Sequence, residues 1–180
     1  MAREEPDRLV IGLDADAASM RTSARRAARR KDGQSNAAFV VAAIESVPAD
    51  LCGVADRVTV YFPWGSLLRG LLAGDGVVSN LGALCANGAE LTALWSVTDR
   101  DLASLGPVPR LPDEGSFEAV GLEVCELRPA TKAEVGATHS TWAKRLRAGV
   151  DRTVSLLRAV RHSPAPRSSQ PVQPDAPSCR

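Results

Sequence analysis

The stretch YFPWGSLLRG, residues 61–70, decides how the rest of the chain is interpreted. It begins at the end of the β-branched and aromatic run Arg57–Phe62, whose composition predicts a buried strand. The proline that follows has no N–H to donate to a sheet, so we expect Trp64 in a loop at the strand's carboxyl end. The leucines from 67 onward repeat at helical spacing, with Ser66 as the predicted N-cap. The stretch therefore predicts a strand, a loop and a helix.

Two interpretations of Trp64 follow. Tryptophan is more often buried than catalytic, so this residue could fill a core. In an open α/β sheet, however, ligands bind where a strand leads through a loop into a helix. Pro63 and Gly65 flank the ring and place it at a turn, which favours a ligand contact.

The composition indicates one globular domain. The 180 residues have 44% hydrophobic content, enough for a sizeable core, and a formal net charge of +1. A surface that binds nucleic acid must therefore be a local patch. The apolar runs are short and broken by charge, so no segment is expected to span a membrane, and no signal peptide is visible at Met1.

Cysteine and histidine usage argues against a metal site. Cys52, Cys85, Cys125 and Cys179 are scattered without a Cys-x-x-Cys pair, and the chain has 2 histidines. The same pattern argues against a disulfide framework and predicts a reducing, cytoplasmic location.

A second predicted strand end carries two acids. The apolar run Arg8–Leu13 predicts a buried parallel strand that ends at Asp14, with Asp16 close behind. In nucleotide-binding α/β folds, a carboxylate at a strand tip accepts hydrogen bonds from ribose hydroxyls. Aspartate also favours helix N-caps, and the two acids can divide these roles.

The next predicted helix, Ala17–Lys31, is stopped by Gly33 and has a cationic end. Like charges four residues apart repel, which argues against a purely stabilising role. Helix C-termini do favour cations, but five without an interleaved acid exceed that preference and predict a phosphate backbone as partner. These residues are Arg25, Arg26, Arg29, Arg30 and Lys31.

The remaining pattern alternates strands and helices, which predicts a mostly parallel α/β sheet with a late antiparallel edge. The predicted strands are Phe39–Ala43, Glu90–Trp95, Val120–Leu127 and Thr153–Val160, with a helix at Val77–Ala86, a turn at Asn87-Gly88, and short helices within 99–114 and near Phe117. Glu45 follows a strand end and is well placed to meet a ligand there.

A second indole lies between the last two predicted strands. Trp142 stands in the basic segment Thr138–Arg152, and stacking combined with phosphate contacts is how proteins hold an unpaired base. Residues 162–180 are rich in Pro, Ser and Gln and predict a disordered tail after a domain of residues 1–161.

Four stretches resemble the KamB/NpmA family of bacterial enzymes, which methylate N1 of the decoding-site adenine(1408) of 16S rRNA and give aminoglycoside resistance. They are residues 12–16, 43–48, 62–70 and 140–146. The last two are specific to the family, whereas the first two are shared with many enzymes that use S-adenosylmethionine. The resemblance covers nearly all of residues 2–161 and implies a class I, Rossmann-like methyltransferase fold.

The resemblance also implies a site for S-adenosylmethionine. Asp14 is similar to the carboxylate that holds the cofactor's ribose, and Ile44 and Glu45 to part of its adenine pocket. Ser66 and Thr141 are similar in position to residues on the methionine side.

A site for the target base and its RNA is implied as well. Trp64 and Trp142 resemble the indoles that sandwich the flipped adenine, and Ser140 sits near them, so these three are the predicted catalytic residues. The arginines that match RNA contacts of the family are Arg25, Arg26, Arg29, Arg30, Arg145 and Arg152. The implied partner is the 30S ribosomal subunit, bound by a monomer without metal.

The implied chemistry needs no general base. Adenine N1 carries its own lone pair, so methylation is a direct in-line displacement that depends mainly on positioning. Two indole faces stabilise the cationic product base as its charge develops. Stacking contributes roughly 1 to 3 kcal/mol per base, which offsets the cost of flipping.

The chain departs from the family by lacking the first βα unit, whose Asp-x-Gly-x-Gly loop wraps the cofactor's methionine end. In the family's sheet that strand lies between the strands that here end at Asp14 and Phe62. Its loss predicts two rows of unpaired backbone groups facing a gap. We expect a start site placed too far downstream or a fragment of a longer gene.

Two other hypotheses stay open. One is a catalytically inactive, RNA-binding remnant of the family, and the other is a small-molecule methyltransferase with the same sheet. The small-molecule hypothesis predicts no use for the cationic cluster at residues 25–31.

Overall fold

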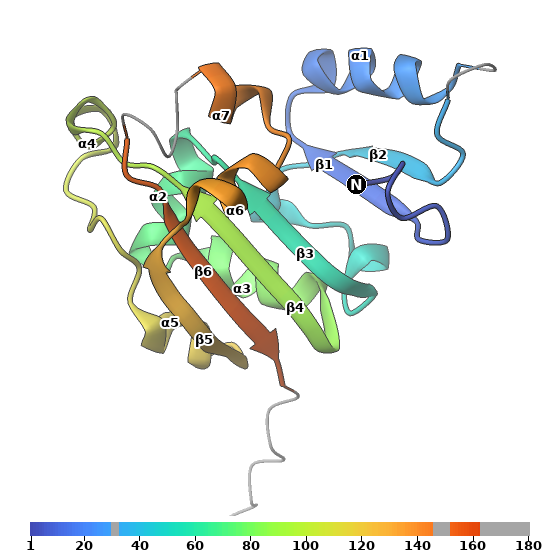
Figure 1. Cartoon of the computed structure of the whole chain (residues 1–180). Coiled ribbons are helices and arrows are strands. Elements are labelled where there is room, and N and C mark those ends of the chain that lie inside the picture. The colour runs from blue at the N-terminus through green and yellow to red at the C-terminus, as the bar shows by residue number, and fades with distance from the viewer. Residues whose placement is uncertain (30–32, 146–151, 163–180) are drawn as a thin grey trace, which may run out of the picture.

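Two separate sheets organise the described part of the chain (Figure 1). The computed structural model describes residues 1–29, 33–145 and 152–162, without the side chains of Arg100, Trp142 and Arg145. The elements are β1 (Val10–Asp14), α1 (Ala17–Ala27), β2 (Ala37–Val41), the 3-10 helices η1 (Ile44–Ser46) and η2 (Ala49–Leu51), β3 (Ala55–Tyr61), α2 (Gly65–Ala73), α3 (Gly76–Leu84), β4 (Cys85–Trp95), α4 (Asp99–Leu105), α5 (Glu114–Glu118), β5 (Leu122–Pro129), α6 (Lys132–Ala137), α7 (Thr141–Arg145) and β6 (Ser155–Arg161).

The gap between the sheets falls between β1 and β3. β1 pairs in parallel with β2, and the second sheet has the order β3-β4-β6-β5. Within the described residues β1 and β3 therefore each have one strand neighbour and one unpaired edge. This confirms the predicted break in the sheet between the strands that end at Asp14 and Tyr61. The prediction of a mostly parallel sheet is wrong for the larger sheet, because β6 is antiparallel to both β4 and β5.

Side chains bridge the two sheets. The Arg8 guanidinium lies 2.8 Å from the Asp56 carboxylate, and Arg57 lies 2.6 Å from Glu5. Both pairs join the chain before β1 to the start of β3, so the amino ends of these strands lie side by side. At the other end, Ile44 of η1 is buried in the core that α3 shares. These contacts hold the smaller sheet against the larger one.

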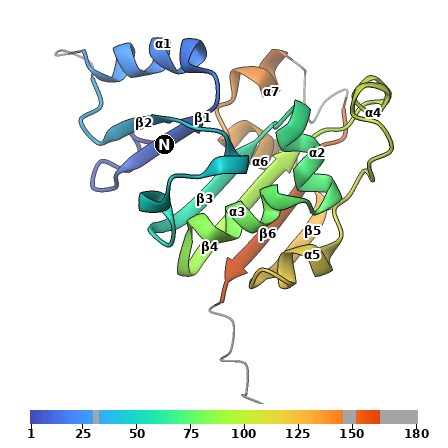
Figure 2. The ribbon, with the colours of Figure 1, turned by 180° about the vertical axis from the view of Figure 1, so that it is seen from behind.

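The larger sheet carries cores on both faces. The main core, on the face that α2, α3 and α5 cover, includes Leu71, Val78, Leu91, Phe117 and Leu157 (Figure 2). Successive residues of a strand point to opposite faces of the sheet. Leu94 and Leu156, next to Trp95 and Leu157 of the main core, therefore belong to a second cluster under α6 and α7. The strands of this sheet are thus packed from two sides.

A glycine sets the distance between two of the covering helices. A Cβ atom at Gly70 of α2 would lie 2.3 Å from Cγ2 of Val77 in α3, so a side chain at this position would force the helices apart. Gly74 ends α2 with φ of 74°, in the left-handed region that glycine adopts at low cost.

Three local predictions differ from the structure. α1 ends at Ala27 and not at Lys31: Ala28 donates to the Ala24 carbonyl, and the Gln34 N–H reaches back to Ala27. The crowded arginines thus lie at and beyond the helix end, where mutual repulsion disfavours a further turn.

The other two differences concern Ser66 and the Asn87-Gly88 turn. Trp64 and not Ser66 is the N-cap residue of α2, and no side chain caps this helix end. Asn87 and Gly88 lie inside β4, which already begins at Cys85. The register between β3 and β4 shifts between Ala55 and Arg57, so the pairing absorbs the irregular residues.

Candidate functional site

The predicted ligand residues gather at the carboxyl ends of the parallel strands. β1 ends at Asp14, β2 leads to Glu45 in η1, and β3 leads through Phe62 and Pro63 to Trp64. Figures 1 and 2 place α1 and α7 at this same end of the molecule. This arrangement is the one in which open α/β sheets bind ligands.

The two acids after β1 divide the roles that the sequence left open. Asp16 caps α1, because its carboxylate accepts the Ala18 N–H at 2.8 Å. The carboxylate of Asp14 accepts the Asp16 N–H at 2.9 Å and the Ser19 hydroxyl at 3.3 Å. Asp14 is exposed, so these contacts orient the carboxylate and leave further lone pairs free to accept from a ligand.

Trp64 is a surface indole. Its side chain is 77% exposed, whereas Phe62 two residues earlier is 7% exposed and fills the core. Phe62 has φ of 52° and Gly65 φ of 59°, so the backbone turns sharply on both sides of Trp64. A bulky residue in the left-handed region is strained, and such strain is concentrated at functional sites. The interpretation of Trp64 as a core residue is therefore wrong.

The buried Phe62 ring links the two indole-bearing segments. It shares one apolar cluster with Val135 of α6 and Ala143 of α7, together with Leu94, Val154 and Leu156. Because Trp64 follows Phe62 and Trp142 precedes Ala143, this cluster sets the separation of the two backbone segments.

The turn into α7 carries Ser140, Thr141 and Trp142, the remaining predicted residues of the base and cofactor sites. The Ser140 hydroxyl accepts the Ala143 N–H at 3.3 Å, and the Ser140 N–H donates to the Thr138 hydroxyl at 3.2 Å. Thr141 is exposed at the first position of α7. The side chain of Trp142 lies outside the described part of the structure.

Two predicted cofactor residues share a pocket. Glu45 and Ser66 line a pocket of about 200 Å³ among η1, α2 and α3, with Arg69 and Asn80 on its wall. The side chain of Ile44 is buried in the main core, and Ile44 does not line the pocket. Asp14 and Thr141 do not line the pocket.

The predicted RNA-binding arginines are exposed where the structure describes them. Arg25, Arg26 and Arg29 lie at the end of α1, and within the described residues none of the three forms an ion pair. Arg152 is exposed ahead of β6. Arg30 and the side chain of Arg145 lie outside the description.

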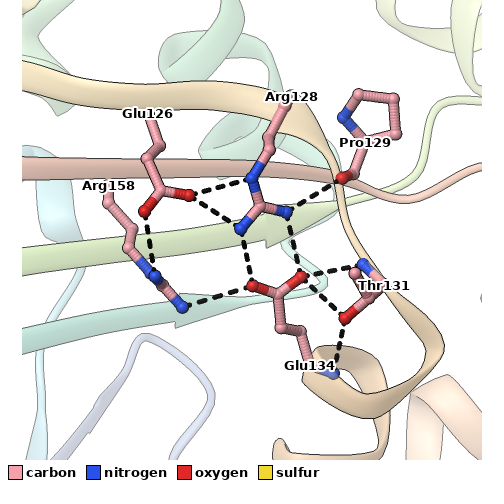
Figure 3. Close-up of polar contacts among 6 residues, drawn as sticks. All are labelled: Glu126, Arg128, Pro129, Thr131, Glu134 and Arg158. Carbon is pink, nitrogen blue, oxygen red and sulfur yellow. Dashed lines mark hydrogen bonds and ion pairs between the residues drawn. The ribbon is translucent and has the colours of Figure 1, made fainter.

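Sequence reasoning missed an ion cluster next to this site, formed by Glu126, Arg128, Glu134 and Arg158 (Figure 3). Hydrogen bonds from Arg128 and from Thr131 lower the pKa of Glu134 from 4.5 to about 2, and the hydrogen bond with Glu134 raises the pKa of Arg128. The spacing Thr131-x-x-Glu134 is a capping-box signature that was visible in the sequence. The contacts with Arg128 and Arg158 depend on tertiary structure.

Metal and membrane features are absent from the part of the chain that the structure describes. No group of three or more His, Cys, Asp or Glu side chains there could hold a metal ion. No helix among those residues has the length and apolar character needed to cross a membrane. Of the tail predicted at residues 162–180, His162 is described and its N–H donates to the Gly121 carbonyl, whereas residues 163–180 lie outside the described residues.

The comparisons with known proteins place this α/β protein in the S-adenosylmethionine-dependent methyltransferase class. The family described as NpmA, 16S rRNA (adenine(1408)-N(1))-methyltransferase, matches residues 1–161. A 16S rRNA (adenine(1408)-N(1))-methyltransferase of Streptoalloteichus hindustanus is 35% identical over 164 residues, which cover 84% of this chain and 75% of the relative. One from Escherichia coli is 30% identical over 135 residues, 68% of this chain and 62% of the relative. The chain belongs to this family.

Solved structures agree with this assignment. A mutant 16S rRNA (adenine(1408)-N(1))-methyltransferase from Catenulisporales acidiphilia, crystallised with cosubstrate SAM, matches with a TM-score of 0.74 and 34% identity. The match covers 91% of this chain and 79% of that one. The 16S rRNA methyltransferase KamB matches with a TM-score of 0.78 and 29% identity, over 90% of this chain and 80% of that one.

Proposed function

We propose that this chain methylates N1 of adenine(1408) of 16S rRNA in the 30S subunit, with S-adenosylmethionine as cofactor, and thereby gives aminoglycoside resistance. The observation that carries the proposal is the exposed indole of Trp64 at the carboxyl end of β3, in the same apolar framework as the Trp142 segment. The family match over residues 1–161 supports it.

The residues at the strand ends fit S-adenosylmethionine. The oriented, exposed Asp14 carboxylate accepts from the ribose hydroxyls, as acids at this position of α/β folds do. Glu45 and the backbone of Ile44 form part of the adenine pocket, and Ser66 and Thr141 lie on the methionine side. When bound, the cofactor supplies an electrophilic methyl group on its sulfonium.

The target base stacks between Trp64 and Trp142, with Ser140 beside it. The two indoles hold N1 in line with the methyl group, and their faces favour the positive charge that develops on the ring. No side chain needs to remove a proton, because N1 of adenine is unprotonated and uses its own lone pair. This explains why the site works through aromatic groups.

The arginines of the α1 end dock the RNA. Arg25, Arg26 and Arg29 are exposed and free of ion pairs within the described residues, so phosphate binding breaks no existing contact. Arg30 extends this cluster, and Arg145 and Arg152 contact the RNA beside the flipped base. The protein acts as a cytoplasmic monomer without metal.

The test is methylation of purified 30S subunits with labelled S-adenosylmethionine, followed by reverse transcription. A methyl group on N1 blocks base pairing, so the expected result is a stop next to position 1408. The control is Trp64→Ala, which is expected to weaken the stop strongly at limiting enzyme. Binding to 30S subunits without methyl transfer would instead support the inactive remnant. Transfer only to small molecules would support the third hypothesis.

A further inference from the structure

We propose that Arg128 and Glu134 are positioning residues that hold the segment α6–α7, and with it one wall of the target-base site. The inference rests on the proposed function, because Ser140, Thr141 and Trp142 at the start of α7 are the residues whose place would be set.

The geometry of the ion cluster singles out this pair. The Arg128 guanidinium places one nitrogen 3.0 Å and another 2.8 Å from the two carboxylate oxygens of Glu134. It also donates to Glu126 at 2.9 Å, and Arg158 donates to Glu126 at 3.1 Å and to Glu134 at 3.3 Å. The four charges alternate in sign around a closed ring (Figure 3).

The ring joins three elements at the start of the α6–α7 segment. Glu126 and Arg128 belong to β5 and Arg158 to β6, whereas Glu134 is in the first turn of α6. The Glu134 carboxylate also accepts the N–H and hydroxyl of Thr131 at 2.8 and 2.9 Å. One carboxylate therefore caps α6 and attaches it to the sheet.

The arrangement does more than add a small amount of stability. The side chains of Arg128, Glu126 and Arg158 are more than a third exposed, and exposed ion pairs contribute little to stability. A two-oxygen contact with a guanidinium does, however, restrict direction as well as distance. The ring is therefore suited to orienting a helix.

The segment has a second attachment of a different kind. Val135 of α6 and Ala143 of α7 belong to the same apolar cluster as Phe62, the residue that leads to Trp64. Without the ring, this apolar contact would still keep α6 on the sheet, but the first turn of α6 would be free to tilt. Chemistry that depends on in-line geometry is sensitive to shifts on the order of 1 Å. RNA docking through α1 would be unaffected, because α1 belongs to the other sheet unit.

The test compares Arg128→Met with Arg110→Met in the full chain. Arg110 pairs with Asp99 at 2.6 Å, far along the chain from α6, so it controls for loss of an exposed ion pair. Amide hydrogen exchange is measured across residues 132–145, and kcat and KM are measured on 30S subunits.

The expected result for Arg128→Met is exchange about tenfold faster in residues 132–145, with other helices unchanged. We expect kcat to fall about tenfold and KM for 30S subunits to change by less, because Arg25, Arg26 and Arg29 still dock the RNA. Arg128→Lys keeps the charge without the two-oxygen contact and should recover part of kcat. Glu134→Gln keeps the capping box and should resemble Arg128→Met.

Unchanged exchange in residues 132–145 would overturn the inference, and so would faster exchange with an unaltered kcat. Equal changes of exchange and kcat in Arg110→Met would show that the ring acts as any exposed ion pair does, and would also overturn the inference. A wild-type chain that transfers no methyl group would instead defeat the proposed function, and the exchange comparison would still decide whether the ring holds the segment.

Discussion

The sheet of β1 and β2 and the sheet of β3, β4, β6 and β5 differ in how many of their apolar side chains are buried. Within residues 1–41, as far as they are described, Met20 is the one buried hydrophobic side chain, while Leu9 is 66% and Val41 56% exposed. In the larger sheet, Leu91 and Leu157 are completely buried. The larger sheet is thus stabilised by its own core, whereas the smaller one packs against that core through Leu13 and Ile44 and forms ion pairs with the start of β3. The proposed ribose site therefore lies on the less buried unit and the proposed base site on the more buried one.

The largest expected effect contrasts the two units in stability. Leu71→Ala removes a side chain with no exposed surface from the main core and should lower the free energy of unfolding by about 2 to 5 kcal/mol. Val41→Ala, on the smaller sheet, should lower it by less than about 0.5 kcal/mol. Urea unfolding of both variants measures this. Equal losses would show that the two sheets share one core.

The second prediction separates function from stability on the larger unit. Trp64→Ala should lower kcat/KM for 30S subunits about 10- to 100-fold, because stacking on a base is worth roughly 1 to 3 kcal/mol. The melting temperature should hardly change, since the indole is 77% exposed. Trp64→Phe keeps an aromatic face and should retain much of the activity. A large loss of melting temperature in Trp64→Ala would contradict the surface role.

The third prediction tests the smaller unit as an RNA-docking surface. Neutralising Arg25 and Arg29 to Gln should weaken 30S binding about tenfold and reduce the slope of log affinity against log salt by roughly 1 to 2. Binding is measured by filter retention at several salt concentrations. Arg110→Gln serves as the matched control. An unchanged salt slope would remove these arginines from the RNA interface.

The smallest effect concerns pH and the ion cluster. The folded state lowers the pKa of Glu134 from 4.5 to about 2, so the ionised carboxylate stabilises the fold above about pH 4.5, and this contribution is lost as the pH falls toward 2. Glu134→Gln should lower the free energy of unfolding by about 1 kcal/mol at pH 7. Urea unfolding between pH 7 and pH 3 should show this difference shrinking. A difference that grows on acidification would contradict the assignment.

Much of the fold follows from local signals. The apolar runs before Asp14 and Tyr61 predict β1 and β3, whereas Asn87-Gly88 predicted a turn at residues that lie inside β4. Helix ends were less predictable: Ser66 is a good N-cap by type, yet the chain uses Trp64 because the left-handed backbone at Phe62 turns the loop first. The type of a residue gives it a preference for the N-cap position. The backbone conformation around it decides whether the helix begins there.

The sequence by itself determined the strands, the acid at the tip of β1, the exposed cations of α1 and, through family-specific stretches, the kind of site. Those properties depend on residues close together in the chain. Only the tertiary structure decided that Phe62 is buried while Trp64 is exposed, and that charges from β5, β6 and α6 close a ring around Glu134. The physical reason is that burial and ion pairing depend on which distant segments come into contact. Periodicity and composition are local properties and do not predict those contacts.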